Sequence, residues 1–110
     1  MIHTMGLNAP SFDKIVDGSK TIELRLYDDK RREIKIGDVI EFSKIDSKDK
    51  VRRKVTALLN FADFEAMIDC LPLSLFGHAD KESVKVGVNK IYPIDKQRAV
   101  TVLGIILAPL

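Results

Sequence analysis

A row of polar side chains occupies every second position in one short segment of the chain. The row consists of Thr21, Glu23, Arg25 and Tyr27, and the positions between them are Ile22, Leu24 and Leu26. Successive side chains of a β-strand point to opposite faces, so a strand here gathers a hydroxyl, a carboxylate, a guanidinium and a phenol on one surface. The apolar side chains then point the other way, into the interior of a barrel. The polar surface is the candidate site.

Lys20, directly before this segment, adds an amine to the same region. In a partly dry pocket Lys20 and Glu23 would form an ion pair, with Arg25 as a second cation beside the carboxylate. Opposite charges lower the pKa of a carboxyl group, so Glu23 would stay ionised and accept a hydrogen bond from the amino group of a base. Lys20 and Arg25 would face a phosphate or a carbonyl oxygen, and Tyr27 could stack on a base. The alternative is an exposed salt-bridge ladder, which contributes only ~0.2–1 kcal/mol.

The rest of the chain predicts the strands and helices that hold these groups in place. Apolar patterns predict strands over residues 2–7, 20–26, 38–45, 51–61 and 102–107. Helical spacing, caps and stops predict helices over residues 10–17, 64–71 and 80–92, with single turns at 28–35 and 95–98. The fourth strand changes from alternating to continuously apolar, which is typical of a strand that curls into a barrel. We therefore expect one α+β domain over residues 1–110, a small mixed barrel with helices packed on one side.

The composition fits a globular domain and excludes several classes of protein. The 110 residues are 45% hydrophobic and 31% charged, and no apolar run approaches the ~20 residues of a membrane helix. The N-terminus lacks the basic and apolar blocks of a signal peptide. Cys70 is the only cysteine, so no internal disulfide can form, and its thiol is expected to pack within a helix in a reducing compartment. We expect a cytoplasmic protein without membrane attachment.

Two clusters of basic residues are more informative than the net charge of +2. The first cluster is Lys30, Arg31 and Arg32, and the second is Lys48, Lys50, Arg52, Arg53 and Lys54. They are either solvated turns and an outward strand face, or contacts for the phosphates of a nucleic acid.

Three sequence motifs resemble one known family. They are G-x-K-T-I-E-x-R at residues 18–25, K-x-G-D-x-I-x-F at residues 35–42, and Ile-Tyr-Pro at residues 91–93 before an apolar strand. On these motifs the chain resembles an ASCH domain of the PUA-like superfamily over nearly its whole length. The resemblance implies a barrel of five to six strands and a charged cleft between barrel and helices, where PUA-like folds bind RNA or modified bases. Some small relatives are amidohydrolases that deacetylate modified cytidine through a lysine, a threonine and a glutamate, and one relative is described as a ribonuclease.

The family's functional residues carry over only in part. The family lysine matches Lys20 and the arginine matches Arg25, whereas the amidohydrolase threonine falls on Glu23. A carboxylate cannot replace a hydroxyl nucleophile without a change of chemistry, and Thr21 lies one strand repeat away, at roughly 6.5–7 Å. The third amidohydrolase residue, a glutamate, falls near Gly77. Acidic residues close to that position are Asp80 and Glu82.

The sequence therefore favours an RNA- or nucleotide-binding domain. The residues expected to bind the ligand are Lys20, Thr21, Glu23, Arg25, Tyr27, Lys30, Arg31 and Tyr92. Tyr92 ends a predicted helix and either faces the cleft, as the resemblance implies, or packs over Pro93. The alternative function is a hydrolase of an acylated cytidine, or a ribonuclease, with Lys20 and Glu23 in its active site. The expected partner is RNA, a nucleotide or a nucleoside, and the expected oligomeric state is a monomer or a weak homodimer.

The two histidines do not form a recognisable metal site. His3 lies in the first predicted strand and is either structural or reaches the cleft, whereas His78, in a glycine-flanked loop, is expected to be exposed. We expect no metal and no cofactor. The apolar loop that contains Leu73, Leu75 and Phe76 is either an exposed surface for a protein partner or a lid folded on the core.

Overall fold

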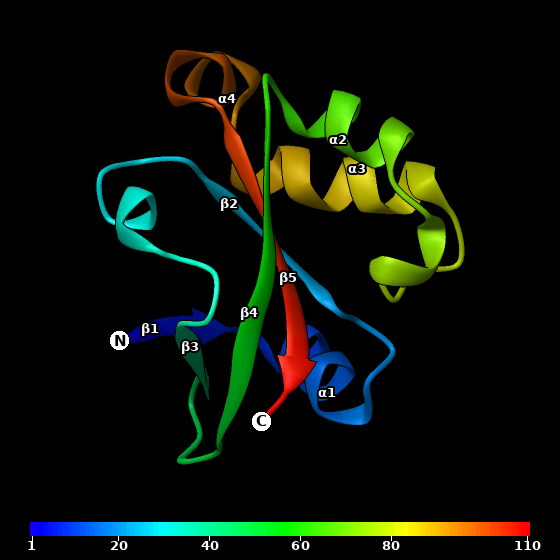
Figure 1. Ribbon diagram of the computed structural model, residues 1–110. Coiled ribbons are helices and arrows are strands. Elements are labelled where there is room, and N and C mark those ends of the chain that lie inside the picture. The colour runs from blue at the N-terminus through cyan, green and yellow to red at the C-terminus, as the bar shows by residue number, and fades with distance from the viewer.

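The computed structural model describes all 110 residues and contains one five-stranded sheet and four helices (Figure 1). The strands are β1 (Ile2–Leu7), β2 (Ile22–Leu26), β3 (Val39–Lys44), β4 (Lys50–Phe61) and β5 (Val102–Pro109). The helices are α1 (Ala9–Asp17), α2 (Phe64–Cys70), α3 (Lys81–Ile91) and α4 (Ile94–Val100), and single 3-10 turns lie at Arg31–Glu33 and Leu73–Leu75. The predicted α+β fold class and the predicted order of elements are confirmed.

The sheet is a half-barrel whose two edge strands come close to each other. Its order is β1-β3-β4-β5-β2, with β1 and β3 parallel and every other neighbouring pair antiparallel. The order leaves β1 and β2 at opposite edges. The sheet curls so far that the Arg25 guanidinium on β2 donates to the Gly6 carbonyl on β1, with 3.0 Å between Nη2 and the oxygen. We call the opening between these two strands the seam.

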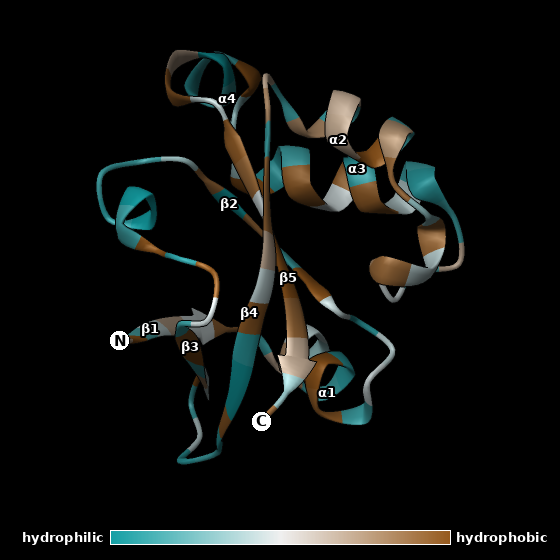
Figure 2. Cartoon of the chain, viewed as in Figure 1, coloured by the Kyte–Doolittle hydropathy of each residue, from teal (hydrophilic) through white to brown (hydrophobic).

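The strand β4 is long enough to pair with both of its neighbours. Its first half pairs with β3 and its second half with β5, and a β-bulge between Val55 and Ala57 shifts the register. Before the bulge the odd-numbered Val55 packs inside the curl of the sheet, and after it the even-numbered Leu58 does so. A bulge bends its strand and increases the twist. It therefore explains why the apolar pattern changes along this strand, whose lower half is the more hydrophilic one in Figure 2.

A separate apolar core covers each face of the sheet. The barrel core, inside the curl, contains Met5, Leu7, Phe12, Ile15, Ile34, Ile40, Phe42, Val55, Leu103, Ile105 and Leu107. The helix core, between the sheet and the helices α2 and α3, contains Ile22, Phe64, Met67, Ile68, Phe76, Val84, Val88 and Val102. The strand β5 contributes to both cores, which accounts for its nearly continuous apolar sequence (Figure 2).

The apolar face of β2 packs in the helix core and not inside the barrel, so the predicted orientation of this strand is wrong. Ile22 is fully buried in the helix core. Glu23 is paired with Ile105 of the barrel core, and residues opposite each other in a strand pair share a face. The inversion arises because α2 and α3 cover the face that carries Ile22. As a result, the charged side chains of β2 lie at the mouth of the half-barrel.

The apolar loop before α3 is folded on the core. Phe76 is 2% exposed and belongs to the helix core, and Leu75 packs against that core. The loop also pairs with the chain entering β2, since Thr21 N–H donates to the Leu75 carbonyl at 3.0 Å and Lys20 forms a β-bridge with Phe76. An exposed apolar loop for a protein partner is therefore excluded. Instead, the loop fixes the backbone at Lys20.

Cys70 is exposed at the end of α2. The buried face of this helix is formed by Phe64, Met67 and Ile68, and Cys70 does not lie on it. The expectation of a thiol packed within a helix is wrong.

Gln97 on α4 is fully buried and connects three elements. Its amide oxygen accepts from the Phe64 N–H at 2.9 Å, and its amide nitrogen donates to Asn89 Oδ1 at 2.9 Å and to the Tyr92 carbonyl at 2.7 Å.

We expect Gln97→Leu to lower the free energy of unfolding by about 2–3 kcal/mol, because buried polar groups lose their partners. Urea denaturation measures this loss. The exposed neighbour Lys96 offers a control, since Lys96→Ala should change stability by less than about 0.5 kcal/mol; equal losses in both variants would contradict a structural role for the buried amide.

Candidate functional site

A pocket of about 490 Å³ opens between the seam and the helix α3. One wall is formed by the end of β1, the start of α1 and the charged side chains of β2, and the opposite wall is formed by α3. A volume of this size lies within the range of roughly 300–1,000 Å³ that is typical of small-molecule sites. The two walls differ in character, because one is ionic and the other apolar.

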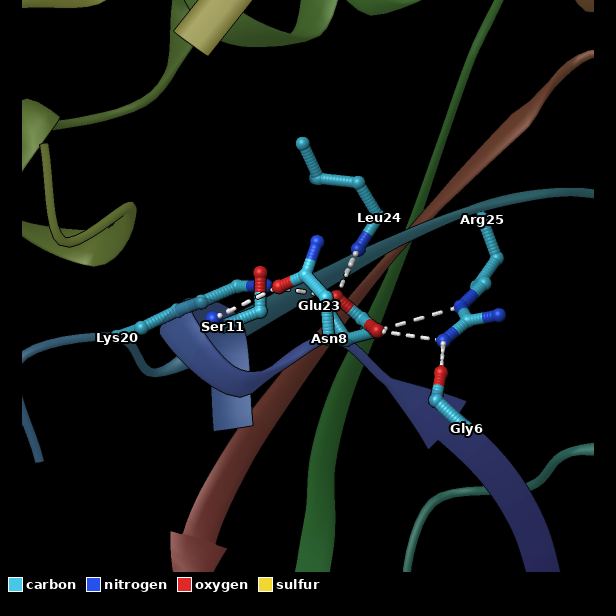
Figure 3. Close-up of polar contacts among 7 residues, drawn as sticks. All are labelled: Gly6, Asn8, Ser11, Lys20, Glu23, Leu24 and Arg25. Carbon is cyan, nitrogen blue, oxygen red and sulfur yellow. Dashed lines mark hydrogen bonds and ion pairs between the residues drawn. The ribbon is translucent and has the colours of Figure 1, made fainter. Parts of the chain in front are cut away.

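The ionic wall is centred on the buried carboxylate of Glu23, which lies between Lys20 and Arg25 (Figure 3). Lys20 Nζ donates to Glu23 Oε1 at 2.9 Å, and Arg25 Nη2 donates to Oε2 at 2.8 Å. Arg25 Nε and the Leu24 N–H also donate to the carboxylate, each at 3.2 Å. The side chain of Glu23 is 4% exposed, against 13% for Lys20 and 14% for Arg25. The group is therefore a desolvated ionic cluster and not a surface ladder.

Glu23 has little capacity left to contact a ligand. A carboxylate offers about four acceptor sites, and the four hydrogen bonds just described occupy them. The expectation that Glu23 accepts from the amino group of a base is therefore not supported by the geometry. Its role is to orient two cations. Lys20 keeps two of its three N–H donors, and Arg25 keeps the two N–H groups of Nη1.

The charge state of this cluster follows from two opposing effects. Burial by itself raises the pKa of Glu23, but the Lys20 and Arg25 charges and their hydrogen bonds outweigh it and hold the pKa of Glu23 below its ordinary value. Burial likewise disfavours the charged form of Arg25, but the Glu23 carboxylate and the Tyr92 hydroxyl raise the pKa of Arg25 above its ordinary value. Glu23 and Arg25 are therefore both charged at neutral pH, and the wall presents cationic donors.

The apolar wall is a stripe along one face of α3. Its pocket-lining residues are Val84, Gly87, Val88 and Ile91, followed by Tyr92 at the end of the helix. Positions three and four apart share a helix face, so this spacing produces one continuous strip. Tyr92 is held in place by Phe64, with 5.6 Å between the ring centroids and 36° between the ring planes. The strip is a suitable surface for the flat, apolar face of a base.

The structure brings together only part of the predicted site. Lys20, Glu23, Arg25 and Tyr92 line the pocket. Thr21 instead lines a neighbouring hollow of about 260 Å³, which Lys20 also borders. Thr21 precedes Ile22, the first residue of β2, so the alternation that places Glu23 and Arg25 on one face does not extend to it. The pocket wall therefore lacks the threonine that a hydroxyl-based mechanism would need.

Three other predicted residues, Tyr27, Lys30 and Arg31, lie outside the pocket. Tyr27 packs against the barrel core, and Arg32 covers its ring at 4.4 Å from the centroid, so the stacking surface is already used. Arg31 pairs with Asp28 at 3.0 Å, and Lys30 is exposed. The reason is distance along the strand, because β2 ends at Leu26 and the chain then leads away from α3.

The two histidines have different roles. His3 Nε2 lies 2.8 Å from Asp38 Oδ2, and His3 lines neither the candidate pocket nor the hollow beside Thr21. Of its two predicted roles, the structural one therefore agrees with the geometry. Hydrogen bonds from His3 and from the Lys35 N–H lower the pKa of Asp38 to about 2. His78 is exposed, as expected, but it also lines the pocket.

The pocket residues that sequence reasoning missed include Lys14 on α1, His78 before α3 and Gly87 within α3. No motif marks Lys14 or His78, which lie 64 positions apart in the sequence. The sequence did offer a sign for Gly87. A glycine inside a helix is unfavourable relative to alanine by roughly 0.5–1 kcal/mol, so its presence there suggests a role in packing or in function.

No three side chains of histidine, cysteine, aspartate or glutamate lie close enough together to hold a metal ion. The helices are also too short or too polar for any of them to span a membrane.

One protein family and several solved structures are similar to this chain. The model of the ASCH domain family matches residues 5–102. The crystal structure of the hypothetical protein PH0355 is similar with a TM-score of 0.87 at 28% identity, over 100% of both chains. The solution structure of Protein PF0455 from Pyrococcus furiosus has a TM-score of 0.76 at 31% identity, over 100% of this chain and 98% of that one. A mutant of ZmASCH from Zymomonas mobilis shares the fold, with a TM-score of 0.66 at 13% identity over 97% of this chain and 67% of that one. None of the curated proteins matches significantly.

Proposed function

The chain belongs to the ASCH domain family, and we propose that it binds a nucleotide or a nucleotide unit of RNA in the pocket between the seam and α3. The observation that carries this proposal is the pair of cations that Glu23 orients toward the pocket. Lys20 and Arg25 retain free donors, and donors of this kind recognise carbonyl and phosphate oxygens. The apolar strip on the opposite wall would contact the base.

The charge of the pocket supports an anionic ligand. Its lining contains three cations, Lys14, Lys20 and Arg25, and a single carboxylate, Glu23, so the charge is 3 − 1 = +2 with His78 neutral. A nucleotide supplies the complementary negative charge together with an apolar base. The hairpin between β3 and β4 extends this surface, because Ile45 lines the pocket and Lys48 and Lys50 follow it.

The hydrolytic alternative has less support in this geometry. Glu23 is saturated with hydrogen bonds and its pKa is lowered by Lys20 and Arg25 in spite of burial, so it is a weak base. The pocket contains no second carboxylate, since Asp80 caps α3 by accepting from the Ser83 N–H at 2.7 Å and Glu82 is not part of the lining. Chromatography of an acylated cytidine and of short RNAs incubated with the protein would detect any product and so test this alternative.

Binding can be measured with a panel of nucleotides and short single-stranded RNAs. A nucleotide at a hundred times its Kd should stabilise the protein by about 2.7 kcal/mol, which a thermal-shift assay detects. Affinity for RNA should also fall as salt rises, with a slope of log K against log salt of about −0.7 for each phosphate contacted. The proposal is wrong if no nucleotide raises the melting temperature and no RNA binds at low salt.

A further inference from the structure

We propose that the pocket selects a terminal phosphate monoester and holds it between Lys14, Lys20 and His78. This inference rests on the proposed nucleotide-binding function and identifies its ligand class as a nucleoside monophosphate or a phosphorylated end of RNA. The phosphate would lie at the Gly77 end of the pocket, and the nucleoside would extend along α3 toward Arg25 and Tyr92.

The backbone brings the two lysines together at Gly77. Lys20 N–H donates to the Lys14 carbonyl at 3.1 Å. A Cβ atom placed on Gly77 would lie 3.1 Å from Lys20 Cβ and 3.3 Å from Lys14 Cδ, so both side chains pass directly beside this glycine. Gly77 has a φ of +69°, which favours glycine, and its missing side chain leaves room for the two lysine stems. His78 is the next residue and lines the same pocket as both lysines, so three nitrogen-bearing side chains from three different segments border one cavity.

These three groups have hydrogen-bonding capacity to spare. Lys14 is half-buried and has no carboxylate within 4.0 Å of its amine. Lys20 uses only one of its three donors, on Glu23. His78 makes no hydrogen bond through its ring. A phosphate has several acceptor oxygens, so a single group could satisfy all three side chains.

The charge count distinguishes a monoester from a diester. The pocket lining has a charge of +2 with His78 neutral, as counted above. A phosphate monoester carries about −1.5 to −2 at pH 7, whereas each phosphate of an internal RNA diester carries a single negative charge. The terminal group therefore neutralises the pocket, and an internal phosphate leaves it positively charged.

The charges around His78 favour the binding of an anion. Burial, Lys14 of α1 and Lys20 before β2 lower the pKa of His78, and Asp80 at the start of α3 opposes them. A bound phosphate would counter the two lysines. Its negative charge should therefore raise the pKa of His78 above the value in the free protein.

Calorimetric titration of ribonucleosides, their 5′- and 3′-monophosphates, and a dinucleoside phosphate tests the inference. We expect at least one monophosphate to bind about tenfold or more tightly than its nucleoside and than the diester, since a hydrogen bond to a charged group is worth about 1.5–3 kcal/mol. Lys14→Gln should remove most of this preference, because it should lower the affinity for the monophosphate much more than the affinity for the nucleoside. The matched control is Lys96→Gln, which removes the same charge at an exposed position of α4 outside the pocket and should retain the preference.

An NMR titration of the two histidines provides an independent measurement. A saturating monophosphate should raise the pKa of His78, and His3 serves as the internal reference because it is bound to Asp38 away from the pocket. Equal affinities for nucleoside and monophosphate, or an unchanged His78, would overturn the phosphate site and leave nucleotide binding intact. If no nucleoside, nucleotide or short RNA binds, the proposed function itself is wrong.

Discussion

Glu23→Gln is expected to lower the free energy of unfolding by about 3–5 kcal/mol, the usual loss when one partner of a buried ion pair is removed. The substitution keeps the shape of the side chain but leaves Lys20 and Arg25 with an uncharged partner. Both cations are mostly buried, with exposures of 13% and 14%, so water cannot fully replace the lost charge. Urea denaturation followed by circular dichroism measures the change.

A matched control lies on β3. Glu41 pairs with Arg52 at 3.1 Å, but the arginine side chain is 51% exposed. Glu41→Gln should therefore change stability by less than about 1 kcal/mol. If the two glutamate variants are equally stable, Glu23 does not organise a desolvated cluster and does not orient Lys20 and Arg25 toward the pocket.

The buried Glu23 carboxylate should also make the stability difference between the wild type and Glu23→Gln depend on pH. Lys20 and Arg25 outweigh burial and hold the pKa of Glu23 in the folded state below its ordinary value of 4.5. The contribution of Glu23 is therefore fully present above pH 4.5 and is lost as the pH falls through the folded pKa. The difference in stability between the wild type and Glu23→Gln should shrink in that acidic range. Asp38, whose pKa is about 2, titrates identically in both proteins and cancels from the difference.

The local composition of the ionic wall could be predicted from the sequence, but its environment could not. A strand period of two is a property of the backbone, so Glu23 and Arg25 had to share a face. Which face of β2 is covered by helices depends on contacts with α2 and α3, far along the chain. The polar face was therefore expected outside the barrel, whereas it lies at its mouth next to Gly6. The burial of Glu23 follows from that difference.

The proposed phosphate end was beyond the reach of local patterns. Lys14 lies on the half-exposed side of an ordinary amphipathic helix, and its place beside Gly77 arises only when the loop before α3 pairs with the chain at Lys20. Tyr27 is the reverse case, a residue that was predicted to line the site but lies outside it. Its side chain is on the same face as Glu23 and Arg25, as expected, but it lies too far along the chain to reach α3, and Arg32 covers its ring.

Gly87→Leu is expected to abolish nucleotide binding while making the protein more stable. Gly87 lies inside α3 on the strip that lines the pocket, and a Cβ added there meets no atom within 4 Å. The space next to it is therefore pocket volume, which a leucine side chain would fill. Glycine inside a helix is unfavourable relative to residues such as alanine and leucine by roughly 0.5–1 kcal/mol, so the substitution should raise the free energy of unfolding by about that amount.

Gly87→Ala separates the two effects, because it supplies the gain in helix stability and fills only the space of one methyl group. Calorimetric titration and urea denaturation of the wild type, Gly87→Ala and Gly87→Leu should show similar stabilisation of both variants, with weakened binding in the first and no measurable binding in the second. A gain in stability together with loss of binding cannot come from a damaged fold, so it would locate the ligand on α3. Full affinity in a stabilised Gly87→Leu protein would mean that the ligand binds elsewhere, and that the unfavourable glycine has no role in recognition.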